Sequence, residues 1–313
     1  MTQSTSPNTE FSDEEQIDAA TLTAQLVDLL TVEQIENDRY RGSPQIDGIG
    51  RVFGGQVIAQ GLQAAQASIT DGKEAHSLHA YFLRGGEEGP PITYDIARDF
   101  DGRSFANRRA VASQDGTPIL NLTASFQKPE EGLAHENSPF PHVPDPGELK
   151  SDQELRKEIL ADRLDQMNEG QRRFMLRPRP IEMRPVDGLH WMHNEPREPK
   201  SQTWFKTVGA LPDDPALHRA VIAYASDYTL LGTAAIAHGM SWMRGELVGA
   251  SLDHAIWFHA PARADEWLLY DTDSPWSGSG RGYNRGRIFT EGGTLVASVA
   301  QEGMMRKRRS PAN

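Results

Sequence analysis

Tyr224-Ala-Ser-Asp227 opens the last third of the chain. Two longer segments follow it: Ala250-Ser-Leu-Asp-His-Ala-Ile-Trp-Phe-His259 and Gly293-Thr-Leu-Val-Ala-Ser-Val-Ala-Gln-Glu-Gly-Met-Met-Arg306. Three polar side chains stand out against the apolar residues of these segments: Asp227, Ser251 and Gln301. Alternate residues of a strand share one face, so Gln301 continues the apolar face of Leu295, Ala297 and Val299. A polar group on such a face predicts a pocket.

These segments have counterparts about 175 residues earlier in the chain. The matches are His79-Ala-Tyr-Phe with His254-Ala-Ile-Trp, Gly102-Arg-Ser-Phe105 with Gly280-Arg-Gly-Tyr283, Asp115-Gly116 with Gly292-Gly293, and Gln127 with Gln301. The separations stay between 174 and 178 residues, which favours an internal repeat over two unrelated α+β domains that share turn residues by chance. The sequence therefore predicts an α+β fold made of two tandem repeats, each a central helix wrapped by a curved antiparallel sheet. The two sheets can pair edge to edge, which would hide their edges.

Periodicity and capping residues predict the elements of each repeat. We expect helices at 15–36 and 52–67, a helix from the capping box at 151–154 through Met167, and a helix from the N-cap Asp214 toward Asp227. We expect strands at 76–83, 92–100, 104–112, 118–127, 181–187, 202–208, 251–259, 267–273, 282–290 and 294–301.

The composition divides the chain into five parts. Residues 1–14 are polar and read as a disordered tail. The first repeat occupies 15–127, a Pro-rich linker with a bracing helix occupies 128–178, and the second repeat occupies 179–306. Residues 307–313 form a basic tail.

Composition also excludes several classes of function. The chain has 313 residues and no cysteine, so disulfides and thiolate nucleophiles are absent, which suits a cytoplasmic location. Residues 1–38 contain no Lys or Arg, unlike a signal peptide, and no apolar run is long enough to span a membrane. The net charge of −12 argues against nucleic acid as a partner.

Metal and nucleotide cofactors also lack support. His76-x-x-His79 and His190-x-x-His193 have a metal-like spacing but no clear third ligand, so we expect no metal. Neither a Gly-x-Gly-x-x-Gly nor a Walker sequence occurs, and we expect no cofactor. No Gly-x-Ser-x-Gly occurs either, which disfavours a serine hydrolase.

The motifs together resemble the acyl-CoA thioesterase II family, whose members have a double-hotdog fold. The resemblance runs from about Val52 to Arg306. It is carried by Phe53-Gly-Gly-Gln-Val57, Leu78-His-Ala-Tyr-Phe-Leu-Arg84, Ile181-Glu-Met-Arg-Pro-Val186, Tyr224-Ala-Ser-Asp227, Ser251-Leu-Asp-His254, Trp257-Phe-His259 and Gln301-Glu-Gly-Met-Met-Arg306. It implies two hotdog domains, hydrolysis of fatty acyl-CoA to a free fatty acid and CoA, and assembly into at least a homodimer.

The resemblance also implies the catalytic residues Asp227, Ser251 and Gln301. Some members have Thr where this chain has Ser251, and either hydroxyl preserves the chemistry. A thioester is an activated acyl group, so a positioned water and a donor to the developing oxyanion suffice. We expect Asp227 to polarise that water, with Ser251 and Gln301 holding it, and no acyl-enzyme to form.

The first repeat lacks this set, which predicts one active site per chain. Gln56 lies near the position that matches Asp227, His76 lies near the match for Ser251, and only Gln127 persists. We therefore expect the first repeat to act as scaffold and as a wall of the acyl pocket. Arg281 and Arg285 are candidates to bind the phosphates of CoA, because the guanidinium group suits phosphate.

Two other functions remain open at this stage. A hotdog hydratase would need a catalytic His near an Asp in a hydratase-type motif, which the sequence does not show. A non-catalytic acyl-CoA binding protein would bind its ligand without turnover and would tolerate the loss of Asp227.

Overall fold

The computed structural model describes residues 17–44, 50–161 and 166–308. Its helices are α1 (Ala19–Leu30), α2 (Gly54–Ala67), α3 (Asp152–Leu160), α4 (Glu169–Leu176), α5 (Pro215–Ser226) and α6 (Leu230–Ile236), with short 3-10 turns at Pro146–Glu148 and His190–Met192. Within the described ranges, no helix is long and apolar enough to cross a bilayer. The predicted tail at 1–14, and residues 309–313 of the basic tail, lie outside the described residues.

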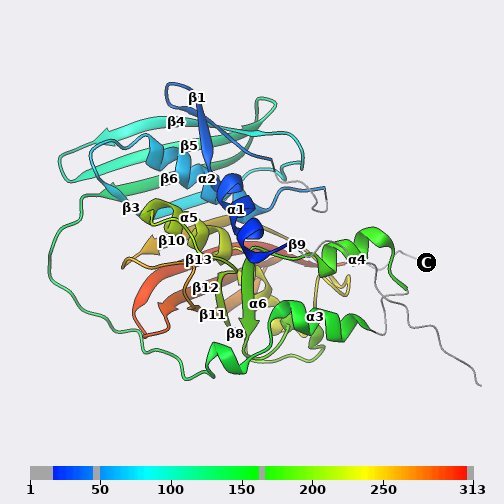
Figure 1. Cartoon of the computed structure of the whole chain (residues 1–313). Coiled ribbons are helices and arrows are strands. Elements are labelled where there is room, and N and C mark those ends of the chain that lie inside the picture. The colour runs from blue at the N-terminus through cyan, green and yellow to red at the C-terminus, as the bar shows by residue number, and fades with distance from the viewer. Residues whose placement is uncertain (1–16, 45–49, 162–165, 309–313) are drawn as a thin grey trace, which may run out of the picture.

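The described strands form one antiparallel sheet (Figure 1). They are β1 (Val32–Glu36), β2 (Arg39–Gly42), β3 (Glu74–Phe82), β4 (Ile92–Asp101), β5 (Phe105–Gln114), β6 (Thr117–Gln127), β7 (Ile181–Pro185), β8 (Lys200–Thr207), β9 (Leu247–Ser251), β10 (Asp253–Phe258), β11 (Leu268–Gly278), β12 (Arg281–Thr290) and β13 (Leu295–Lys307). Their order is β1-β2-β4-β5-β6-β3-β10-β13-β12-β11-β8-β7, and β9 pairs with β13. The two repeats join at β3 and β10, so the predicted edge-to-edge pairing is confirmed.

α2, the helix enclosed by the strands of the first half, packs against α5, whereas α6 is the helix that packs on β11, β12 and β13 of the second half. A Cβ on Gly55 would lie 2.5 Å from the carbonyl oxygen of Tyr224, and one on Gly54 would lie 2.7 Å from Asp227 Oδ2. Only glycine permits so close an approach. The N-terminus of α2, from the first repeat, therefore touches the C-terminus of α5, from the second.

A long segment without helix or strand, residues 128–145, runs from β6 to the second half along the outside of the molecule (Figure 1). It is held at its far end, because Trp204 Nε1 donates to the carbonyl of Pro144 at 3.0 Å. Phe140 packs edge-on against Phe289 with ring centroids 5.6 Å apart. These contacts form a small second core on the outer side of the second half.

Three predicted elements differ from the structure. The helix predicted at 15–36 ends at Leu30, and residues 32–36 form β1. The backbone of β1 pairs with β2 across a turn where Asp38 takes a positive φ of 56°. The strand predicted at 251–259 is two strands, interrupted at Leu252. The helix predicted from the capping box begins at Asp152 as expected but ends at Leu160, and α4 is a separate helix with its own capping box. Leu164 lies outside the described residues.

The internal repeat is confirmed for the hairpin turns. Two of the matched residues, however, lie on the opposite face of the sheet from their partners in the other half. The turns at Gly102 and Gly280 join β4 to β5 and β11 to β12, so they correspond. His79, however, lies on the exposed face of β3, whereas His254 is fully buried. Gln127 likewise lies on the outward face of β6, whereas Gln301 is 1% exposed. A one-residue error in register exchanges the two faces of a strand, so both matches are wrong.

Candidate active site

Asp227 is the C-cap residue of α5, just before α6, where the end of α5 touches the N-terminus of α2. Its side chain is 6% exposed, and its Oδ1 accepts a 2.7 Å hydrogen bond from Gln301 Nε2. Burial raises the pKa of Asp227 to about 7, while the bonds from Gln301 and from the backbone N–H of Gly55 pull it down. An acid with this pKa exchanges a proton readily near neutral pH, as a general base must.

The Gln301 amide is oriented by His254. Gln301 Nε2 lies 3.1 Å from His254 Nδ1, and His254 Nε2 lies 2.9 Å from Ser226 Oγ. The Ser226 hydroxyl donates its one hydrogen to the carbonyl of Ala223, so it accepts from His254 Nε2. Nδ1 is then the acceptor, which assigns the tautomer. Burial lowers the pKa of His254 to about 3, so the ring stays neutral.

These hydrogen bonds leave the side-chain oxygen of Gln301 without a partner among the described residues. Both hydrogens of its Nε2 are used, one by Asp227 and one by His254. Gln301 Oε1 is buried and has no partner among the described residues. Asn284, opposite Gln301 in the register of β12 and β13, is fully buried with neither amide atom bonded. Buried amides without partners mark a place for a water or a polar group of a substrate.

Sequence reasoning missed Asn284 and the role of His254. A signal for Asn284 exists in its strand, because it shares the inward parity of Gly282, Gly286 and Ile288. Only the register of β12 against β13 shows that it faces Gln301.

Ser251 is placed near these groups but not bonded to them. It is the last residue of β9 and lies opposite Gly303 of β13. Opposite residues share a face, and Gly303 and Gln301 are two residues apart, so Ser251 lies diagonal to Gln301 on the same face. Within the described ranges its hydroxyl has no hydrogen bond. The structure thus joins Asp227 and Gln301 directly and sets Ser251 across the strand pair.

Arg281 and Arg285 lie elsewhere. Side chains of β12 alternate, and these two point to the outer face of the sheet, away from Asn284. Arg281 Nε bonds Glu302 at 2.9 Å, and Arg285 is held by two bonds to Asp273 at 2.9 and 2.7 Å. The structure does not bring either arginine to the side of the sheet that carries Asp227.

Three packed aromatic residues lie beside Asp227 and form one wall of the site. Phe53, from the first repeat, packs edge-on against Tyr224 at 5.1 Å and lies 4.7 Å from the ring of Tyr228. The Tyr228 hydroxyl donates to that of Tyr224 at 3.1 Å. The first repeat therefore supplies both an aromatic wall and the Gly55 N–H that faces Asp227.

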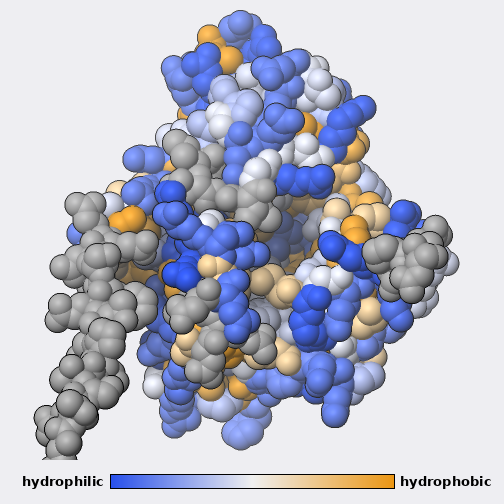
Figure 2. Space-filling model, turned by 90° about the vertical axis from the view of Figure 1, so that its right-hand side faces the viewer, coloured by the Kyte–Doolittle hydropathy of each residue, from blue (hydrophilic) through white to orange (hydrophobic). Residues whose placement is uncertain are grey.

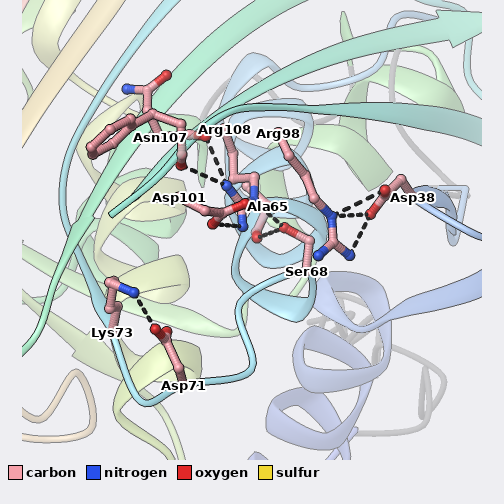
Figure 3. A network of polar contacts seen from close by, with 10 residues as sticks. Asp38, Ala65, Ser68, Asp71, Lys73, Arg98, Asp101, Asn107 and Arg108 are labelled. Carbon is pink, nitrogen blue, oxygen red and sulfur yellow. Dashed lines mark hydrogen bonds and ion pairs between the residues drawn. The ribbon is translucent and has the colours of Figure 1, made fainter. Parts of the chain in front are cut away.

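The C-terminal end of α2 in the first repeat holds a buried guanidinium (Figure 3). Ser68 is the C-cap residue of this helix, and Gln56 lies in its first turn. Arg108 is 2% exposed and bonds Ser68 Oγ at 2.8 Å and Asp101 Oδ1 at 2.6 Å. It also donates to the carbonyls of Phe100 and Asn107. The first half thus places an arginine at the C-terminus of α2, whereas Asp227 lies in the second half.

Two helix-and-sheet halves joined edge to edge in one antiparallel sheet define a double-hotdog fold. Comparison with known proteins agrees with this class. The family models for the N-terminal and C-terminal domains of acyl-CoA thioesterases match residues 43–127 and 158–305. Human acyl-coenzyme A thioesterase 8 is 37% identical over 89% of this chain and 88% of its own length.

Solved structures give the same result. The acyl-CoA thioesterase II TesB2 of Mycobacterium marinum is 39% identical, covers 90% of this chain and 98% of that chain, and superposes with a TM-score of 0.72. A hot dog fold protein from Alicyclobacillus acidocaldarius is 16% identical, covers 92% and 99%, and has a TM-score of 0.71, which supports the fold alone. The chain belongs to the acyl-CoA thioesterase family, the enzymes that hydrolyse acyl-CoA thioesters.

Proposed function

We propose that this chain hydrolyses fatty acyl-CoA by direct attack of a water held by Asp227, Ser251 and Gln301. The observation that carries the proposal is the 2.7 Å bond between Gln301 and a buried Asp227 whose pKa is about 7. The water oxygen attacks the thioester carbonyl carbon while Asp227 takes a proton from the water. The tetrahedral intermediate collapses, the C–S bond breaks, and the leaving thiolate takes the proton held by Asp227. The products are free CoA and a carboxylic acid, which then releases its proton to water.

Each residue has a distinct part in this step. Gln301 donates its two N–H hydrogens to Asp227 and His254. Its Oε1 therefore remains to accept a hydrogen bond from the water. Ser251, diagonal on the same face, supplies a hydroxyl that can both donate and accept. The N-terminus of α2 stabilises the ionised form of Asp227 through the Gly55 N–H.

Thiol release from a series of saturated acyl-CoAs tests the proposal. A thiol reagent works cleanly because the chain has no cysteine. Asp227→Asn should lower kcat by roughly 10²–10⁴-fold, the usual contribution of a general base. Ser251→Thr should retain activity and Ser251→Ala should lose it. Wild-type binding of acyl-CoA without turnover would instead favour the non-catalytic binding protein.

We also propose that the chain forms a homo-oligomer in the cytoplasm. The outer face of the sheet carries exposed aromatic residues where the two halves join, among them Tyr81 at 60% and Trp257 at 37% exposed. Exposed apolar groups that gather on one face are typical of a surface that another copy covers. Sedimentation of the wild type against Trp257→Asp tests this: the variant should sediment as a smaller species. The assignment of CoA phosphates to Arg281 and Arg285 stays a prediction.

A further inference from the structure

Asn284 is a buried amide that the proposed reaction does not use. It lies in β12 with no exposed surface, and neither its Nδ2 nor its Oδ1 has a hydrogen bond within the described residues. A buried amide without partners destabilises a protein relative to an apolar side chain of the same shape. Such a side chain is expected where a ligand supplies the missing hydrogen bonds.

The residues next to Asn284 on its own strand cannot bond it. Its neighbours on the same face of β12 are Gly282 and Gly286, which have no side chain. The spaces that their Cβ atoms would fill are taken by carbon atoms, with Ala234 Cβ at 2.5 Å from the first and the Tyr270 ring at 2.3 Å from the second. Apolar groups of α6 and β11 therefore close in on both sides of Asn284.

Thr272, on the strand β11 beside β12, has no hydrogen bond to give to Asn284. It lies opposite Gly286, and so diagonal to Asn284 on the same face. Its hydroxyl donates its one hydrogen to the carbonyl of Ser201 at 2.8 Å, and it therefore accepts from Thr233 Oγ1 of α6 at 3.1 Å. These two threonines satisfy each other, and Asn284 stays without a partner.

Gln301, on the strand β13 at the other side, lies directly opposite Asn284 and does not bond it. The Cβ atoms of directly opposite residues are about 4.5–5.5 Å apart, so one small group can reach both amides. Gln301 has one free acceptor, Oε1, whereas Asn284 has a free donor and a free acceptor. The attacking water bonds Oε1 in the proposed reaction, which leaves both atoms of Asn284 for a second group.

This second group is enclosed within the protein. β9 and α4 lie toward one side of the molecule in Figure 1, and that side faces the viewer in Figure 2. Hydrophilic residues dominate this face, and the surface is hollowed near its middle (Figure 2). Asn284, in contrast, has no contact with open solvent. Its partner is an enclosed water or a polar atom of the bound substrate, and only the second makes the rate depend on the acyl group.

We propose that Asn284 recognises a hydroxyl group on the second or third carbon of the acyl chain, so that hydroxyacyl-CoA thioesters are the preferred substrates. This inference rests on the proposed function, because it places the thioester carbonyl at the water held by Asp227 and Gln301. A hydroxyl accepts from Nδ2 and donates to Oδ1, whereas a carbonyl or carboxylate oxygen can only accept. Asn284 is one strand away from Gln301, so it meets the carbons next to the carbonyl and not the far end of the chain.

The test compares four thioesters of one chain length: octanoyl-CoA and its 2-hydroxy, 3-hydroxy and 8-hydroxy derivatives. Release of the CoA thiol gives kcat/KM for each substrate. We expect the wild type to favour the 2-hydroxy or the 3-hydroxy substrate over octanoyl-CoA by about tenfold, the usual effect of one or two net hydrogen bonds. The 8-hydroxyl is equally polar but distant from the carbonyl, and it should bring no gain.

Asn284→Leu is the first variant, because leucine has a similar shape without polar atoms. The ratio of kcat/KM for the hydroxylated substrate to that for octanoyl-CoA should fall from about ten to about one, since the site no longer rewards a hydroxyl. Thr233→Val is the matched control. It also removes a buried polar group between α6 and the sheet, but one that is already bonded within the protein. Its ratio should equal that of the wild type.

Three results would overturn this role of Asn284. The wild type could show equal kcat/KM for octanoyl-CoA and both near-hydroxylated substrates, as an enclosed water would produce. The 8-hydroxyl could bring the same gain, or Asn284→Leu could keep the preference. The first two results need no variant, so they do not depend on the folding of a variant. Failure of the proposed function has a different signature, because the wild type would then hydrolyse none of the four thioesters.

Discussion

Gln301 donates a 2.7 Å hydrogen bond to Asp227 across 74 residues of sequence, and the Gly55 N–H of the other repeat faces the same carboxylate. The carboxylate of Asp227 is thus held jointly by a strand of its own half and a helix N-terminus of the first half. Neither repeat alone would complete this environment. The consequences can be measured in five ways.

Ionisation of the buried Asp227 should lower the free energy of unfolding of the protein. The pKa of Asp227 rises from 3.8 to about 7 on folding, so the folded state holds a proton that the unfolded chain releases. Between these values stability falls as pH rises, and above pH 7 the cost reaches roughly 4 kcal/mol at most. Asp227→Asn should therefore melt several degrees above the wild type at pH 8, with a smaller gap at pH 5. Equal melting temperatures at both values would contradict the buried, uncharged acid.

The pH dependence of kcat/KM should report the same group. A general base works when ionised, so activity should rise with pH and level off above about 7. His254 adds no second step, since burial lowers its pKa to about 3 and it is neutral throughout. A profile measured from pH 5 to 9 checks this. Activity that is already level at pH 5 would show that Asp227 is not the base.

Replacing the Gln301 amide by an acid of the same shape should disable the site. Gln301→Glu places a second carboxyl against Asp227 Oδ1, and two adjacent carboxylates cannot both ionise easily. We expect kcat/KM at pH 7 to drop by at least tenfold, with the rise in activity moved to higher pH. Gln127→Glu, on the outward face of β6, is the control and should match the wild type.

His254 should act through Gln301 and not on the substrate. His254→Phe removes both the acceptor for Gln301 Nε2 and the bond to Ser226. The amide then loses its fixed orientation, so kcat should fall about tenfold while KM changes little. Steady-state kinetics of this variant and of His79→Phe, on the exposed face of β3, provide the measurement. A change in KM alone would place His254 in substrate binding instead.

We expect the Asn284 side chain to lower the stability of the protein and to raise its activity. Its two amide atoms are buried without protein partners, so Asn284→Leu removes polar groups that cost about 1–3 kcal/mol each when unsatisfied. We expect an equal or higher melting temperature together with a lower kcat, because the water or substrate group beside Gln301 loses a partner. Asn121→Leu, at an exposed position of β6, is the control. Full activity in Asn284→Leu would remove Asn284 from the site.

The sequence by itself determined the architecture and predicted Asp227 as the acid of the site. Alternating strands, glycine hairpins at a nearly constant separation, and the capped helix that begins after Asp214 predicted two helix-and-sheet repeats, because these patterns are local and set by backbone geometry. The resemblance carried by Tyr224-Ala-Ser-Asp227 and by the motif around Gln301 indicated the pair that the structure joins.

Only the tertiary structure decided which groups face each other. The inward or outward direction of His79 and Gln127 depends on register, which one residue reverses. Asn284 faces Gln301 because of the pairing of β12 with β13. Burial then set the chemistry, since Asp227 owes its raised pKa to desolvation by residues distant in sequence, which no local pattern encodes.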